Sequence, residues 1–209
     1  MFVAIAVVAV VLVVASVVAG LANRSSSPTW QGTLDQPAFH KPEFVLTDDS
    51  GQRYDFDQRT KGQLTLLYFG YTHCPDFCPI TMDTLAGALA DLPDKPVTVV
   101  FVTTDPSRDT PAVLHKWLGN FNGSFVGLTG TPAELAAAQK AAGVSVAIAD
   151  KPDKNGNYQV GHAASVLAYT PDGLQHLSYP FGTTQSDWVH DIPQILGTAA
   201  WNRTPGAGT

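Results

Sequence analysis

Two short, nearly continuous runs of apolar residues constrain the fold of this chain more than any other feature. They are Leu64–Phe69 and Val97–Val102, both dominated by aliphatic and aromatic side chains. Such runs are typical of strands covered on both faces, and strands of this kind pair in parallel through a helical crossover. The residues from about Pro79 to Asp91 fit that helix, and Pro93 closes it. The sequence therefore predicts an α/β fold.

The rest of the chain continues the alternation of strands and helices. Two hairpins are expected, Phe44–Leu46 with Tyr54–Phe56 around Asp49-Ser-Gly51, and Ser165–Tyr169 with Leu174–Leu177 around Pro171-Asp-Gly173. The other expected elements are a helix from Pro111 to Trp117, a strand at Phe125–Leu128, a helix from Pro132 to Ala142, a polar hairpin or loop from Asp150 to Tyr158, and a helix from Asp187 to Leu196. This order predicts a central mixed sheet flanked by helices, with the first hairpin as an N-terminal extension.

The N-terminal segment, residues 1–22, contains no charged side chain. About 20 apolar residues suffice to cross a bilayer as a helix, whereas the apolar core of a cleavable signal is usually about 7 to 15 residues long. We therefore expect a transmembrane anchor at 1–22. A cleaved signal peptide is the alternative, because Gly20-Leu-Ala22 resembles a small-residue cleavage site. Residues 23–41 are then expected to be a linker, 42–197 a single domain, and 198–209 a flexible tail.

The charge balance argues against a nucleic-acid partner. The chain carries 18 acidic and 12 basic residues, for a net charge of −6. Nucleic-acid binding depends on clustered basic side chains that neutralise phosphates, and no such cluster is visible.

The chain has only two cysteines, Cys74 and Cys78, directly behind the first buried strand. A disulfide between residues four apart stabilises almost nothing, so the pair is predicted to act chemically, as a redox dithiol or as a soft-metal site. Proline suits the first position of a helix, so the helix is expected to begin at Pro79, with both cysteines on the loop before it. The positive end of the helix favours thiolates, which assists a nucleophile and a metal ligand alike.

Three segments carry a family resemblance. They are Tyr68-Phe-Gly-Tyr-Thr-His-Cys-Pro-Asp-Phe-Cys-Pro79, then Thr104-Asp-Pro-Ser-Arg-Asp-Thr-Pro111, and then Gly161-His162 ahead of the Pro171-Asp-Gly173 turn. Over roughly Pro42 to Leu196 the chain resembles the Sco/SenC family of membrane-anchored copper chaperones that serve cytochrome c oxidase. The resemblance implies a thioredoxin-like fold, a single span in the cell membrane with the copper domain on the extracytoplasmic side, and Cys74, Cys78 and His162 as copper ligands.

The chemistry of that ligand set supports the resemblance. Two thiolates and one imidazole suit Cu(I), and the imidazole also accommodates Cu(II) during transfer. Structural zinc sites normally have four ligands, and the sequence offers no second cysteine pair to complete one. One departure from the family concerns the position before His162. Many members place an acidic residue there, whereas this chain has Gly161.

Four further residues are expected to surround the ligands: His73, Asp76, Asp105 and Arg108. His73 adjoins Cys74 and is expected to tune its thiolate without binding the metal. Asp105 and Arg108 are expected to close their loop with an ion pair, while Asp109 or Thr110 caps the helix that begins at Pro111. A functional role for this loop is the second interpretation, because α/β sheets place their sites at the carboxyl ends of the central strands.

The resemblance implies a metallochaperone rather than an enzyme. Its recipient would be the dinuclear copper site of cytochrome c oxidase subunit II, and an upstream copper donor would load it. A thioredoxin-like reductant is also implied, because a Cys74–Cys78 disulfide would remove both sulfur ligands. The alternatives are a thiol-disulfide oxidoreductase and a redox or copper sensor. The oxidoreductase is disfavoured by the Cys-x-x-x-Cys spacing and by the absence of a proline in Gly161-His162-Ala163.

Overall fold

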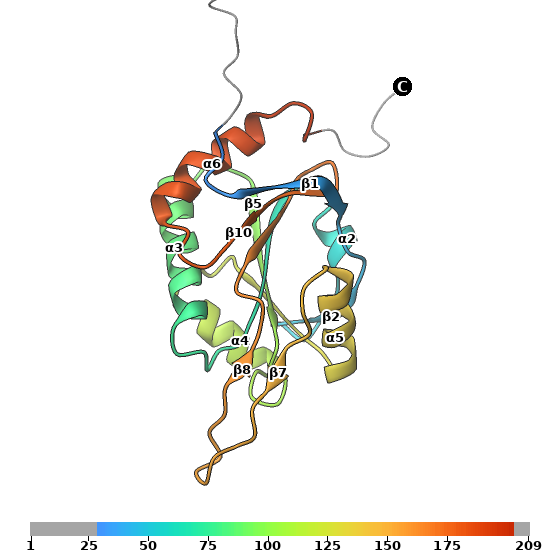
Figure 1. Ribbon diagram of the computed structural model, residues 1–209, viewed down its shortest axis with the longest axis vertical. Coiled ribbons are helices and arrows are strands. Elements are labelled where there is room, and N and C mark those ends of the chain that lie inside the picture. Colours follow the sequence, from blue (N-terminus) through green and yellow to red (C-terminus); the bar gives the residue numbers. More distant parts are fainter. Residues whose placement is uncertain (1–28, 203–209) are drawn as a thin grey trace, which may run out of the picture.

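The computed structural model describes residues 29–202, which build an eight-stranded mixed sheet in the order β1-β10-β9-β4-β5-β6-β2-β3 (Figure 1). Its central strands β4, β5 and β6 are parallel, and the remaining neighbours pair antiparallel. The strands are β1 (Thr33–His40), β2 (Val45–Asp48), β3 (Arg53–Asp55), β4 (Leu64–Gly70), β5 (Val97–Thr103), β6 (Val126–Thr129), β9 (Val166–Tyr169) and β10 (Leu174–Tyr179). Every residue of β4 is buried, as its apolar run predicts.

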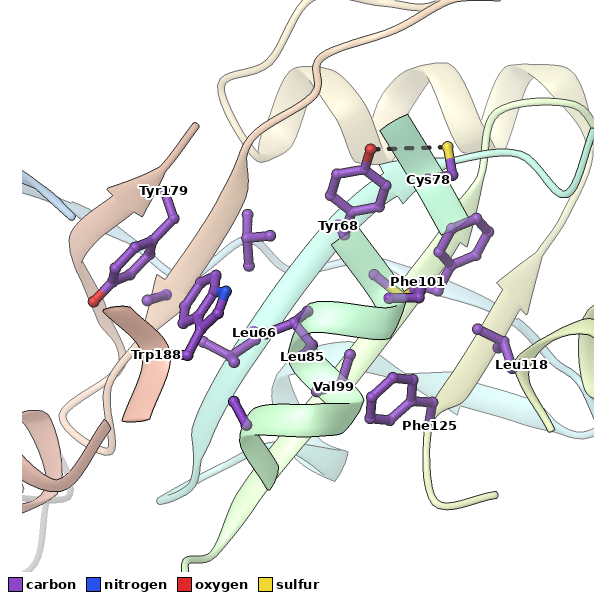
Figure 2. Packing of buried hydrophobic residues seen from close by; sticks show 14 of the residues in the cluster. Leu66, Tyr68, Cys78, Leu85, Val99, Phe101, Leu118, Phe125, Tyr179 and Trp188 are labelled. Carbon is purple, nitrogen blue, oxygen red and sulfur yellow. Dashed lines mark hydrogen bonds between the residues drawn. The ribbon is translucent and has the colours of Figure 1, made fainter. Parts of the chain in front are cut away.

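Helices cover both faces of the sheet, and alternate side chains of β4 supply one core each. On one face, Leu66 and Tyr68 pack with α3 (Phe77–Asp91), α4 (Pro111–Leu118) and α6 (Gln185–Gly197). On the other face, Leu67 and Phe69 pack with α2 (Phe56–Arg59) and α5 (Pro132–Ala141). Figure 2 shows the first core, in which Leu85 of α3 and Trp188 of α6 lie against β4. The predicted α/β class is therefore confirmed.

A separate two-stranded hairpin, β7 (Ile148–Ala149) with β8 (Val160–Gly161), projects beyond one end of the central sheet (Figure 1). It encloses the polar segment for which a hairpin or loop was expected. Both predicted hairpins within the main sheet, β2–β3 and β9–β10, also form.

Helix α3 begins at Phe77, two residues before the expected start at Pro79. Pro79 is the third residue of the helix, where its missing N–H costs nothing, because the first four N–H groups of any helix lack a partner within it. Cys78 therefore lies in the first turn of α3, whereas Cys74 lies on the loop before it.

The expected linker, residues 23–41, contains an edge strand. Strand β1 pairs antiparallel with β10, and Asp35 accepts hydrogen bonds from Gln175 Nε2 (2.8 Å) and Ser178 Oγ (3.2 Å). The sequence of β1 lacks the alternation of apolar and polar residues by which a strand is recognised, because most of its side chains are exposed. Strand β1 is instead stabilised by backbone pairing with the edge of β10.

The first residues of the expected tail, 198–202, pack against the domain, whereas residues 203–209 lie outside the described residues. The Trp201 ring stacks on Trp30 with centroids 4.9 Å apart and on His176 at 4.4 Å. The Trp201 carbonyl also accepts a 3.0 Å hydrogen bond from the Asp172 N–H. These contacts tie residues 198–202 to the end of the β9–β10 hairpin.

The predicted anchor, residues 1–22, lies outside the described residues. Within 29–202, none of the helices combines the length and the apolar character that crossing a membrane requires.

Candidate metal centre

The dithiol lies where β4 ends and α3 begins. The loop between them is closed by a hydrogen bond of 3.2 Å from the Cys74 N–H to the Tyr71 carbonyl. The first turn of α3 directs the Cys78 N–H at Cys74 Sγ, at 3.5 Å. Cys74 is 7% exposed and Cys78 is fully buried, and neither forms a disulfide. Cys74 is therefore the sulfur that an incoming molecule reaches first.

Gly70, the last residue of β4, is required by this packing. A Cβ atom at that position would lie 2.7 Å from Cys78 Sγ and 2.7 Å from the Tyr68 ring. Any larger residue would push the first turn of α3 away from the sheet.

His162 reaches the dithiol from the other side, immediately after β8. Its Nε2 atom lies 3.5 Å from Cys78 Sγ, although the two residues are 84 positions apart. The donor atoms of Cys74, Cys78 and His162 all lie within 4.8 Å of one another. The structure thus brings together the three residues that the sequence analysis named as ligands.

The orientation of the His162 ring suits a metal ligand. Its Nδ1 atom lies 3.0 Å from the Ala163 carbonyl oxygen, which can only accept a hydrogen bond. In the neutral ring Nδ1 therefore carries the proton, and Nε2 presents its lone pair to the sulfurs. The rings of Tyr68 and Tyr71 stand edge-on to the imidazole, with centroids 6.0 and 5.6 Å away.

The two thiols differ in acidity. Hydrogen bonds from the Cys78 thiol and then its backbone N–H lower the pKa of Cys74 well below its usual range. Burial raises the pKa of Cys78, and the neighbouring Cys74 sulfur raises it further. The Tyr68 hydroxyl donates a 3.8 Å hydrogen bond to Cys78 Sγ (Figure 2). These opposite shifts favour the thiolate at Cys74 and the thiol at Cys78, so a metal bound by both sulfurs would displace a proton from Cys78.

The expected ion pair between Asp105 and Arg108 forms. Asp105 is buried and also accepts a 2.9 Å hydrogen bond from the Tyr158 hydroxyl. The Arg108 guanidinium lies 3.7 Å over the Tyr158 ring and 5.7 Å from the Tyr71 ring. The loop therefore contacts Tyr71, whose ring packs against the His162 ring, and Tyr158, which lies four residues before His162.

His73 and Asp76 take positions at the edge of the site. The His73 ring is half-exposed, with Nδ1 3.0 Å from Thr72 Oγ1 and 3.9 Å from Asp109 Oδ1, so it faces Asp109. Asp76 is the N-cap residue of α3, but its carboxylate forms no capping hydrogen bond. It contributes to the site through its backbone, which helps to lower the pKa of Cys74.

Asp109 is a residue whose role the sequence analysis missed. Thr110 caps α4, through a 3.4 Å hydrogen bond from the Val113 N–H. Asp109 is fully buried and accepts hydrogen bonds from the Thr72 N–H (3.0 Å), Thr72 Oγ1 (2.6 Å) and Thr103 Oγ1 (2.6 Å). An aspartate just before a helix is compatible with either role, so the sequence does not distinguish a helix cap from a buried carboxylate at this position. Tyr68, Tyr71 and Tyr158 were likewise not predicted to surround the site, although the first two belong to the cysteine motif.

An open cavity of about 400 Å³ leads to the dithiol. Cys74 and His162 line it together with Phe77 and Ile148, which are 45% and 73% exposed. The position before His162 also faces this cavity. A Cβ at Gly161 would meet only the Ile148 carbonyl, at an ordinary 3.7 Å, so the missing acidic side chain is not excluded by lack of space.

Comparison with known proteins identifies the family. The SCO1/SenC family model matches residues 32–197. Among curated proteins, the mouse mitochondrial protein SCO2 homolog is 35% identical over 168 residues, which are 75% of this chain and 64% of the relative. The mitochondrial protein SCO2 of Saccharomyces cerevisiae is 35% identical over 133 residues, which are 62% of this chain and 44% of that one. The chain thus spans about half to two thirds of the length of these relatives.

Solved structures agree with this match. The copper-bound structure of ScoI from Bradyrhizobium japonicum has a TM-score of 0.67 and 33% identity, covering 76% of this chain and 99% of that one. The copper-bound crystal structure of yeast Sco1 has a TM-score of 0.68 and 27% identity, covering 81% of this chain and 92% of that one. The sequence motifs, the fold and the matched model agree, and the chain belongs to the SCO1/SenC family.

Proposed function

We propose that the protein is a copper metallochaperone that binds one copper ion through Cys74, Cys78 and His162. The observation that carries this proposal is the clustering of their three donor atoms within 4.8 Å. The copper-bound relative from Bradyrhizobium japonicum supports the choice of metal.

The donor set fits Cu(I). Thiolates are soft ligands that select Cu(I), and an imidazole completes a three-coordinate site. Structural zinc is normally held by four protein ligands, and the cluster within residues 29–202 offers three. The imidazole also accommodates Cu(II), so the same residues serve in either oxidation state.

A site of three ligands beside an open cavity suits release as well as binding. Ligands of a partner protein can approach through the cavity and replace Cys74, Cys78 and His162 one at a time. The proposed recipient is the dinuclear copper site of cytochrome c oxidase subunit II. We further propose an upstream copper donor, a thioredoxin-like reductant that keeps the dithiol reduced, and tethering through residues 1–22 with the domain on the extracytoplasmic side of the cell membrane.

The proposal predicts that the reduced domain binds one Cu(I), and that His162→Ala weakens binding by at least the factor of about 10 to 100 that the loss of a ligand's outer hydrogen-bond partner costs, while both thiols remain titratable. Cu(I) affinity by competition with a chromophoric chelator, together with X-ray absorption, measures the effect for the wild type and for variants of each ligand. His176→Ala is the matched control, because His176 pairs with Asp172 in the β9–β10 hairpin. Undiminished affinity in His162→Ala would contradict the three-ligand site.

A thiol-disulfide oxidoreductase is the second candidate, and the lowered pKa of Cys74 favours it. The Cys74 thiolate would attack a substrate disulfide, forming a mixed disulfide and releasing one thiolate. Cys78 would then attack Cys74, releasing the second thiol and leaving a Cys74–Cys78 disulfide. The substrate gains the two electrons that the dithiol loses. Rapid reduction of insulin by the purified domain would favour this candidate over the chaperone.

A further inference from the structure

One loop contacts both halves of the candidate metal centre. It runs from Thr103, at the end of β5, to Asp109, and internal hydrogen bonds hold it in one conformation. The Asp105 N–H donates to Thr103 Oγ1 (2.9 Å), and Thr103 Oγ1 donates to Asp109 Oδ2 (2.6 Å). The Thr104 N–H donates to the Gly70 carbonyl, joining the loop to the end of β4 at 2.6 Å.

The first contact of the loop is with the dithiol segment. Asp109 is fully buried, and two of its three hydrogen bonds come from Thr72, which lies two residues before Cys74. A buried carboxyl group with several hydrogen-bond donors is strongly held, because each donor that is lost leaves a buried oxygen atom with an unmade hydrogen bond. Asp109 therefore fixes where the chain leaves β4 and turns towards Cys74.

The second contact is with the hairpin that carries His162. Asp105 is 4% exposed and accepts from both Arg108 and the Tyr158 hydroxyl, which lies 2.9 Å away. Arg108 Nη2 also donates to the Tyr158 carbonyl at 3.2 Å, and its guanidinium covers the Tyr158 ring at 3.7 Å. Tyr158 is thus held at its hydroxyl, its ring and its backbone, two residues before β8.

Arg108 extends the second contact to the imidazole. Its guanidinium carbon lies 5.7 Å from the Tyr71 ring centroid, within the range of a cation–π contact, and Tyr71 stands edge-on to the His162 ring. Beyond Tyr158, the hairpin from 150 to 157 is exposed. The contacts with Asp105 and Arg108 therefore lie at the end of the hairpin nearest to the metal ligand.

We infer that the loop Thr103–Asp109 sets the distance between the two halves of the centre, with Asp109 positioning the dithiol through Thr72, and Asp105 with Arg108 positioning His162 through Tyr158 and Tyr71. These side chains are positioning residues, since none of them is among the three clustered donors. The inference deepens the proposed function, because it names what brings the imidazole to the sulfurs.

The first test needs no metal. The His162 ring lies nearly perpendicular to two tyrosine rings, whose ring currents displace its NMR resonances. Arg108→Met removes the ion pair and the stacked guanidinium, and Tyr158→Phe removes only the hydroxyl bond to Asp105. We expect both variants to move the His162 resonances of the copper-free protein towards those of a free imidazole, Arg108→Met by more. Wild-type resonances in both variants would overturn the inference.

Arg53→Met is the matched control for this test. It removes an exposed arginine that pairs with Asp55 at 3.4 Å in β3, at the edge of the sheet opposite to β1. We expect it to leave the His162 resonances in place. The same displacement in this control would mean that the resonances report general loosening, which would also overturn the inference.

The second test is a double-mutant cycle on Cu(I) affinity. Arg108→Met should weaken Cu(I) binding by about tenfold when His162 is present, since residues that orient metal ligands typically contribute about 10- to 100-fold in affinity. In the His162→Ala background the same change should alter affinity by less than about twofold. Thr72→Val, acting on the sulfurs, should weaken binding in both backgrounds. An equal loss from Arg108→Met in both backgrounds would overturn the inference.

The two tests separate the inference from the proposed function. If the wild type fails to bind Cu(I), the proposed function fails, while the metal-free NMR comparison still decides whether Arg108 and Tyr158 position His162. If copper binds and the NMR resonances do not move, only the positioning inference fails.

Discussion

At the scale of single residues, the site combines groups of two kinds. Cys74 and Cys78 were singled out by residue type, since they are the only cysteines of the chain, whereas His162 was named by the family resemblance, since it is one of six histidines. The role of Asp109 could not be recognised from residue type, because it depends on the three hydrogen bonds that the carboxylate accepts in the folded protein. Tyr158 likewise gains its role from Asp105, which is 53 positions away.

The unequal pKa values of the two cysteines predict selective chemistry. Because the pKa of Cys74 is lowered and that of Cys78 is raised, Cys74 should be the thiolate at pH 6, where an ordinary thiol of pKa about 8.5 is almost fully protonated. Iodoacetamide at pH 6 should therefore modify Cys74 first, as mass spectrometry of peptides can show. In Cys78→Ala, which lacks the thiol hydrogen bond, the pKa of Cys74 rises and its modification at pH 6 should slow by about tenfold. Equal labelling of both cysteines in the wild type would contradict this assignment.

At the scale of helices and strands, local sequence was a good guide to position and a weaker guide to boundaries. Buried strands β4 and β5 begin where their apolar runs begin. Helix α3 starts before Pro79 because proline is tolerated throughout the first turn, so its presence does not distinguish the first position from the third. Strand β1 had no recognisable pattern, since an edge strand with exposed side chains depends on its neighbour for stability.

The cap of helix α6 allows a prediction about stability. Thr184 and Asp187 form a reciprocal capping box, in which the Thr184 N–H donates to Asp187 Oδ2 at 2.8 Å and the Asp187 N–H donates to Thr184 Oγ1 at 3.3 Å. Thr184→Ala should lower the free energy of unfolding by about 1 kcal/mol, measured by urea denaturation. Cu(I) affinity should be unchanged, because α6 contributes none of the three clustered donors. The exposed Ser145→Ala is the control, and a loss as large there would argue against the cap as the cause.

At the scale of the whole molecule, the two ends of the described chain meet. Trp30 precedes β1, and Trp201 follows α6, yet their rings stack at 4.9 Å beside His176. Asp191 of α6 strengthens this closure, since it is fully buried and accepts hydrogen bonds from the Gln31 and Gly32 N–H groups at 2.9 and 3.1 Å. The segment before the first hairpin is therefore part of the folded domain.

The stacked tryptophans predict a measurable coupling. A double-mutant cycle with Trp30→Ala and Trp201→Ala should give a coupling free energy of about 0.5–1.5 kcal/mol in urea unfolding, because stacked aromatic rings interact beyond the apolar area that they bury. Each single variant should also be less stable than the wild type. Strictly additive effects would show that the two rings do not stabilise one another.

The sequence by itself determined the alternation of strands and helices and the position of the dithiol at the start of α3. Both depend on residues close together along the chain, through apolar periodicity and through the geometry of a helix terminus. Only the tertiary structure decided that His162 lies beside Cys78 across 84 residues, and that the loop Thr103–Asp109 contacts both Thr72 and Tyr158. Such long-range contacts depend on the order of strands in the sheet and on buried hydrogen bonds between distant segments. Neither can be recognised from a pattern of neighbouring residues in the sequence.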